Sequence, residues 1–166
     1  MSTPSSGSGL KTFTAVIAVI FGLVLLIGGI YLAVLGGSWY YIIAGLLFIA
    51  TAVLLQKLKS TALIVYALLV LGTVVWGLWE VGSDFFALAP RLDILGLFGL
   101  WLLIPAVTRG FDNVKSAKLV LTGSLAITIA VMIYAVFNDP QEIRGELSSK
   151  QPATAQSIPG VADGDW

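Results

Sequence analysis

The chain has 166 residues, of which 58% are hydrophobic and only 11% are charged, and its nine Lys and Arg balance nine Asp and Glu. Together with a mean hydropathy of +0.98, this composition is typical of a membrane protein. The sequence contains no Cys and no His, which excludes disulfides, thiol redox chemistry, Cys/His zinc sites and His-ligated haem. The lack of a basic block gives no indication of a nucleic-acid partner.

Five apolar runs, with a charge at most next to one end, approach or exceed the roughly 20 helical residues that cross a bilayer core of about 30 Å. They predict an all-α integral membrane protein with transmembrane helices over residues 13–35, 39–55, 61–79, 92–108 and 117–137. The first run is the strongest, because 15 of its 23 residues are Leu, Ile, Val or Phe, which favours insertion by roughly 7 kcal/mol before polar costs. It is also too long for a signal peptide and lacks an A-x-A cleavage pattern, so we expect it to stay attached.

Short polar segments separate the predicted helices. Gly36, Gly37 and Ser38 predict a tight turn, which makes the first two helices antiparallel neighbours. The other expected connections are 56–60, a longer loop over 80–91, and 109–116. Before the first helix we expect a tail at 1–12, and after Phe137 an extended linker at 138–166, which begins with the helix-ending Asn138-Asp139-Pro140.

The distribution of basic residues predicts the direction of insertion. With five spans the termini face opposite compartments, and one side carries six of the nine basic residues. These are Lys11, Lys57, Lys59, Arg109, Lys115 and Lys118, against Arg91, Arg144 and Lys150 on the other side. Because Lys and Arg are retained on the cytoplasmic side, we expect a cytoplasmic N-terminus and a periplasmic C-terminus.

Polar and aromatic side chains gather at the predicted outer rim of the membrane. Trp76, Trp79 and Glu80 fall on one helix face at i, i+3 and i+4, and two indoles beside a carboxylate could bind a flat lipophilic ring such as a quinone headgroup. Aromatic side chains also form interfacial belts without binding any ligand, and an exposed Arg–carboxylate pair contributes only about 0–1 kcal/mol. Both interpretations stay open. The candidate site residues are Trp76, Trp79, Glu80, Asp84, Arg91 and Asp93.

Apart from Asp93 and Lys118, each the second residue of its span, the five predicted spans contain no charged residue. A proton relay or ion pathway through them would lack its usual carriers, which argues against a transporter. The sequence also shows no phosphate-binding loop, nucleophile–base pair or metal-binding cluster. From the residues alone, the chain is a five-helix membrane module without recognisable catalytic groups.

Three stretches together resemble a known family. They are YLAVLGGSWYY at 31–41, GTVVWGLWEVGSDFFALAPRLD at 72–93 and FNDPQEI at 137–143. In this order and spacing they are similar to the N-terminal membrane domain of the membrane-bound, PQQ-dependent glucose/quinate/shikimate dehydrogenases. The resemblance extends from about residue 13 to the last residue.

In that family, a five-helix anchor in the bacterial inner membrane precedes a periplasmic β-propeller, which binds PQQ and a divalent metal, oxidises a sugar or cyclic polyol and passes electrons to ubiquinone. The resemblance implies that Asp165 and Trp166 open the propeller and that the family's catalytic residues have no matching positions here. We therefore expect a membrane anchor domain or subunit that needs a periplasmic PQQ partner and has no chemistry of its own. The alternatives are a quinone-binding electron-transfer module at the periplasmic rim and, third, an unrelated small transporter.

Overall fold

The computed structural model describes residues 6–138, and within them α-helices are the only regular secondary structure. The helices are α1 (Ser6–Val34), α2 (Tyr40–Gln56), α3 (Thr61–Val81), α4 (Phe85–Leu102) and α5 (Val114–Phe137). By length and composition α1, α3, α4 and α5 can each cross a membrane, whereas α2 is apolar but has only 17 residues. The prediction of an all-α, multi-pass membrane protein is confirmed. The five-span count and the direction of insertion stay predictions, and the linker after 138 lies outside the described residues.

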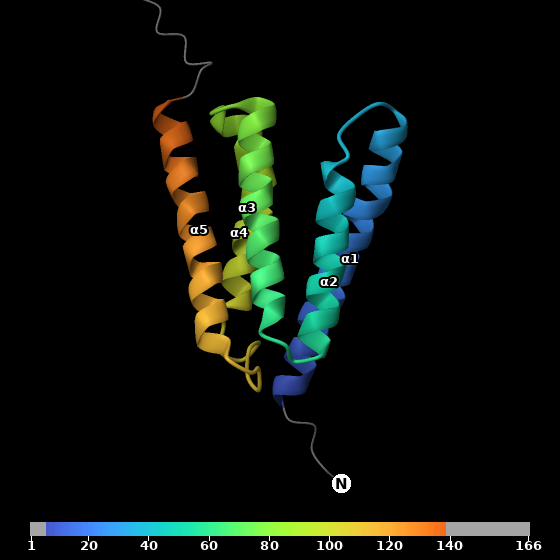
Figure 1. The fold of residues 1–166 in the computed structure, drawn as a ribbon, viewed down its shortest axis with the longest axis vertical. Coiled ribbons are helices and arrows are strands. Elements are labelled where there is room, and N and C mark those ends of the chain that lie inside the picture. The colour runs from blue at the N-terminus through green and yellow to red at the C-terminus, as the bar shows by residue number, and fades with distance from the viewer. Residues whose placement is uncertain (1–5, 139–166) are drawn as a thin grey trace, which may run out of the picture.

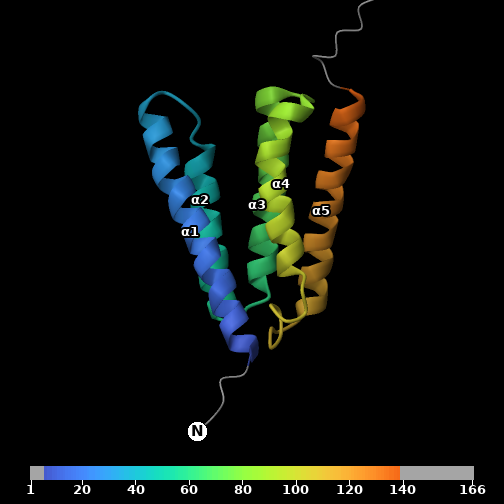
Figure 2. The same cartoon turned by 180° about the vertical axis from the view of Figure 1, so that it is seen from behind.

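The helices form two groups that meet at one end of the molecule and separate toward the other (Figure 1). The pair α1 and α2 makes one group, and α3, α4 and α5 make the second, as the reverse view also shows (Figure 2). We call the closed end, which carries Lys57, Lys59 and Lys115, the basic end. The open end, which carries Trp79 and Phe86, is the aromatic end.

The turn between α1 and α2 has the predicted tight form. Gly36 adopts a φ of 82°, which is strained for residues with a Cβ, and its N–H donates to the Ala33 carbonyl at 3.1 Å. The two helices then run antiparallel in close contact. A Cβ added at Gly45 would lie 2.6 Å from the Leu26 nitrogen and 2.7 Å from the Gly22 oxygen. Small residues therefore allow the backbones of α1 and α2 to touch.

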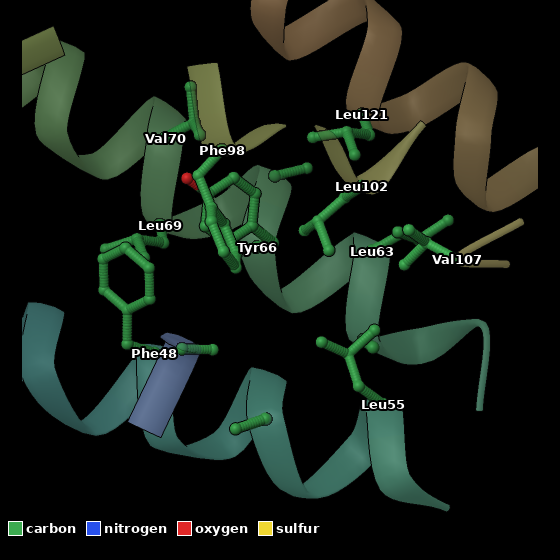
Figure 3. Close-up of a cluster of buried hydrophobic side chains, with 14 of the residues drawn as sticks. Phe48, Leu55, Leu63, Tyr66, Leu69, Val70, Phe98, Leu102, Val107 and Leu121 are labelled. Atoms are coloured by element: carbon green, nitrogen blue, oxygen red, sulfur yellow. The ribbon is translucent and has the colours of Figure 1, made fainter. Parts of the chain in front are cut away.

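A cluster of aromatic rings joins the two helix groups. Phe21 of α1 and Phe48 of α2 meet Tyr66 of α3 and Phe98 of α4, with ring centroids 5.4–6.3 Å apart, and Figure 3 shows three of these rings within the buried core. The fully buried Tyr66 donates its hydroxyl proton to the Leu95 carbonyl at 2.7 Å. Tilted and edge-to-face rings of this kind stabilise each other beyond their buried area, so the cluster fixes α1 and α2 against α3 and α4.

Helix α4 begins earlier than the sequence indicated, and this corrects the predicted loop at 80–91 and span at 92–108. Gly82 ends α3 at a φ of 65°, and Asp84 caps α4 by accepting a hydrogen bond from the Ala87 N–H at 3.1 Å. Pro90 lies inside the helix. At its other end α4 stops at Leu102, before Pro105, because a proline disfavours helical backbone in the residue that precedes it.

The shift of α4 changes the charge distribution within the helices. Arg91 and Asp93 belong to α4 itself, so the expectation that the membrane helices carry no ionisable residue is wrong for this helix. Helices α3 and α5 also carry charged residues close to one end, which are Glu80 in α3 and Lys115 and Lys118 in α5. Helix α1 also begins at Ser6, which places most of the expected tail at 1–12 in the helix. Helices α2 and α3, and the end of α5, lie within two residues of the predicted bounds.

Candidate functional site

A cavity of about 580 Å³ lies between the two helix groups. Its volume is within the range of small-molecule sites, roughly 300–1,000 Å³. The rings of Phe21 and Phe48, which belong to the aromatic cluster, border it on the side of the core. Four helices contribute to its wall, through Phe21 and Val24 of α1, Tyr40 and Tyr41 of α2, Thr73 and Trp76 of α3, and Arg91 and Ile94 of α4.

Stacked rings form the wall of the cavity near the aromatic end. The Tyr40 and Trp76 rings lie 4.4 Å apart with an interplanar angle of 9°, and the Tyr41 ring meets Trp76 edge-on at 5.3 Å and 74°. Tyr40 belongs to the first turn of α2 and Trp76 to the last third of α3. The stack therefore joins the two helix groups at the open end and places three aromatic side chains in the wall of the cavity.

Arg91 brings a positive charge to this cavity. Its Nη2 lies 3.0 Å from Glu80 Oε2, its Nη1 donates to the Ala87 carbonyl at 2.7 Å, and its Cζ lies 5.6 Å from the centre of the Trp76 ring. The Arg91 and Glu80 side chains are 26% and 36% exposed, so the pair is only partly shielded from solvent. A guanidinium held by two acceptors and an aromatic ring has a fixed orientation and retains further N–H donors.

Two hydroxyl groups lie in the wall of the same cavity. The Tyr40 hydroxyl and the Thr73 hydroxyl form a short hydrogen bond between α2 and α3. The Thr73 hydroxyl also donates to the Leu69 carbonyl, one turn earlier in α3, at 2.8 Å. A largely apolar cavity with an aromatic wall, a cation and a hydroxyl pair suits a lipophilic ring that carries oxygen atoms.

The structure separates the six predicted site residues. Trp76 and Arg91 line the cavity, and Glu80 contacts it only through Arg91. Trp79 is 82% exposed and lies on the outer face of α3.

The two predicted aspartates lie away from the cavity. Asp84 caps α4, and Asp93 is exposed and borders a separate depression between α4 and α5.

Sequence reasoning left Tyr40, Tyr41 and Thr73 out of the candidate site. Thr73 precedes Trp76 by three residues and therefore shares its helix face, a signal that the sequence did contain. The two tyrosines follow the α1–α2 turn, and a place in the aromatic belt accounted for them equally well. Their position opposite Trp76 depends on how α2 packs against α3, which local patterns do not specify.

The loops at the basic end hold their own polar contacts. The Ser60 N–H donates to Asp112 Oδ1 at 3.1 Å, and this hydrogen bond lowers the pKa of the Asp112 carboxyl below its ordinary value. Lys118 Nζ donates to the Leu103 carbonyl at 3.0 Å, just beyond the end of α4. Across residues 6–138, no cluster of three or more His, Cys, Asp or Glu could hold a metal ion.

The chain is similar to three groups of curated proteins. It is 61% identical over its whole length to the quinoprotein glucose dehydrogenase A of Acinetobacter calcoaceticus, and covers 21% of that relative. Over 66% of its length it is 38% identical to the quinate/shikimate dehydrogenase (quinone) of Acinetobacter baylyi, covering 14% of that protein. Over 60% of its length it is 37% identical to the glycerol dehydrogenase small subunit of Gluconobacter thailandicus, covering 81% of that subunit.

These matches differ mainly in how much of each relative the chain spans. It corresponds to the N-terminal fifth of the quinoprotein glucose dehydrogenases, but to most of the small subunit. No family model matches the chain, and no solved structure does. The chain belongs to the family of membrane domains that form the N-terminal region of quinoprotein glucose and quinate dehydrogenases and that resemble the glycerol dehydrogenase small subunit.

Proposed function

We propose that the chain is the membrane anchor of a PQQ-dependent dehydrogenase of the glucose/quinate/shikimate type. It holds a catalytic part at the periplasmic face of the bacterial inner membrane, and the assembled enzyme passes electrons to ubiquinone. The observation that carries the proposal is the match to both long dehydrogenases and a separate small subunit. The same kind of module thus occurs as one part of a long dehydrogenase and as a separate small subunit. This supports an anchoring role, because the module can hold a catalytic part that is either fused to it or bound to it as another chain.

PQQ and its divalent metal then belong to the catalytic part. A divalent metal needs several carboxylate, carbonyl or imidazole ligands, and residues 6–138 offer no such cluster. The described residues therefore do not fit this cofactor, and we assign them no step in the oxidation of the substrate.

The native product tests the anchoring role. Affinity purification from bacterial membranes, followed by an assay with PQQ, Ca²⁺ and an artificial electron acceptor, should recover sugar or polyol dehydrogenase activity. The activity should reside on the same polypeptide or on a separate large partner. An antibody against residues 141–166 distinguishes these cases by the size of the polypeptide that it detects. A purified product without any PQQ-dependent activity would refute the anchoring role.

The orientation is supported by the basic residues at one end of the helices, such as Lys57 and Lys115. Because the chain has no Cys, single cysteines can be labelled without background. We expect a membrane-impermeant maleimide to label Ser38→Cys, at the aromatic end, in cells with a permeabilised outer membrane. Ser116→Cys, at the basic end, should react only after the inner membrane is disrupted. The reverse pattern would show the opposite orientation.

A second candidate function is quinone binding, which the cavity beside Trp76 and Arg91 favours. A quinone headgroup is flat, apolar and edged by carbonyl oxygens, so the aromatic wall can pack on its ring and Arg91 can donate to an oxygen. Trp76→Ala and Arg91→Ala in the membrane-bound enzyme should raise the apparent KM for quinone and leave dye-linked activity unchanged. Trp79→Ala is the matched control, because Trp79 lies outside the cavity. Unchanged quinone kinetics in the first two variants would exclude the site.

A further inference from the structure

We propose that the cavity prefers the reduced quinol to the oxidised quinone, an inference that rests on the quinone site proposed above. The preference comes from the hydroxyl groups of Tyr40 and Thr73. Both residues line the cavity, and both hydroxyl protons are committed to acceptors within the protein. The oxygen of Tyr40 is therefore left as a hydrogen-bond acceptor.

The hydrogen bonds on Thr73 determine the direction of the bond to Tyr40. A threonine hydroxyl has a single proton, and Thr73 donates it to the Leu69 carbonyl at 2.8 Å. In the short bond between the two hydroxyls, Thr73 must then accept, so Tyr40 is the donor. Once its proton is used in this way, the Tyr40 oxygen can still accept hydrogen bonds but cannot donate one.

The two redox forms of a quinone differ in this property. The carbonyl oxygens of the oxidised form only accept hydrogen bonds, whereas each hydroxyl of the quinol can also donate. A quinol hydroxyl can donate to the Tyr40 oxygen, while the quinol's second oxygen accepts from the guanidinium of Arg91, which retains N–H donors beyond its two described acceptors. A quinone carbonyl facing Tyr40 would instead place two acceptors against each other. Donation by Tyr40 would require it to leave Thr73.

The remaining lining residues match the apolar part of such a ligand. Val24 of α1 and Ile94 of α4 both line the cavity, and their exposed surfaces, 63% and 52% of the two residues, are apolar. In a bilayer these surfaces face lipid. The cavity therefore has an apolar opening between α1 and α4, through which an isoprenoid tail can extend into the membrane.

Equilibrium dialysis tests this preference with the full chain in lipid nanodiscs, under anaerobic conditions, with decylubiquinol and decylubiquinone as probes. We expect the Kd for the quinol to be about fivefold lower than that for the quinone, as one additional hydrogen bond gives. Tyr40→Phe should remove this difference by weakening quinol binding alone. Thr73→Val should also remove it, but by strengthening quinone binding, because valine cannot accept the Tyr40 proton, which then becomes available to a quinone carbonyl while the Tyr40 oxygen can still accept from a quinol hydroxyl. Thr73→Ser keeps the hydroxyl and should retain the preference of the unmodified chain.

Two substitutions outside the cavity serve as matched controls. Thr51 is buried in α2 and donates to the Leu47 carbonyl at 2.8 Å, so Thr51→Val removes an equivalent hydroxyl. Tyr31→Phe alters a tyrosine that is 68% exposed. Both controls should keep the quinol preference. Equal affinities for both forms in the unmodified chain would overturn the inference and leave the quinone site standing, whereas no binding of either form would overturn both.

Discussion

Gly29 contacts α2 so closely that replacing it with alanine should separate the first two helices. A Cβ at this position would lie 2.7 Å from the Ile42 nitrogen and 2.8 Å from the Tyr41 carbonyl carbon. Unbonded heavy atoms prefer about 3.5–4.0 Å, and backbone atoms cannot rotate away as a side chain can. The start of α2 must therefore move by several tenths of an ångström, at a cost of about 1–3 kcal/mol for an overpacked contact.

The neighbouring glycine provides the control. A Cβ at Gly28 would meet nothing within 4 Å, so Gly28→Ala should leave the free energy of unfolding unchanged or slightly raised. Titration of both variants with SDS in mixed micelles measures this free energy. Because Tyr41 belongs to the displaced turn, Gly29→Ala should also weaken any ligand of the cavity. Equal stability of the two variants would refute the close packing of α1 on α2.

Three other substitutions test the remaining contacts. Trp76→Ala should lower the free energy of unfolding by at least about 1 kcal/mol, because it removes the stack on Tyr40, whereas Trp79→Ala at an 82% exposed position should not lower it. Tyr66→Phe should cost about 1 kcal/mol in the same assay, since it removes the hydrogen bond from the buried Tyr66 hydroxyl to the Leu95 carbonyl. Asp112→Asn should change how stability depends on pH. The pKa of Asp112 is lower in the folded chain, so its contribution is present at neutral pH and is lost as the pH falls through the folded pKa. The two proteins should differ at neutral pH and converge in acid; a constant difference would exclude the hydrogen bond from Ser60.

The sequence was most informative where structure depends on local composition. The apolar runs located all five helices, and Gly36 and Gly37 indicated the turn that makes α1 and α2 antiparallel. The error at α4 arose from treating Pro90 as the end of a loop. Asp84 is a suitable N-cap, and the five residues between it and Pro90 form the first turns of the helix. The sequence interpretation gave more weight to the proline than to this N-cap and therefore predicted a loop.

The candidate site was less predictable, because it depends on packing between helices. Helix periodicity placed Trp76, Trp79 and Glu80 on one face, but it could not show that only Trp76 reaches the cavity. That difference arises because Tyr40 of α2 covers one side of α3 and leaves the other side to lipid. The ion pair of Arg91 likewise formed with Glu80 on α3, and not with Asp93, its near neighbour in sequence.

The anchoring role is tested most directly by a chimera of the quinoprotein glucose dehydrogenase A of Acinetobacter calcoaceticus. In this chimera, the chain replaces the matching N-terminal region of that enzyme. The two regions are 61% identical, so the helices should fold and hold the catalytic part in the same way. We predict that the chimera sediments with the membrane and oxidises glucose with decylubiquinone as the acceptor. A chimera that keeps dye-linked activity but is released from the membrane, or that no longer reduces quinone, would contradict the account.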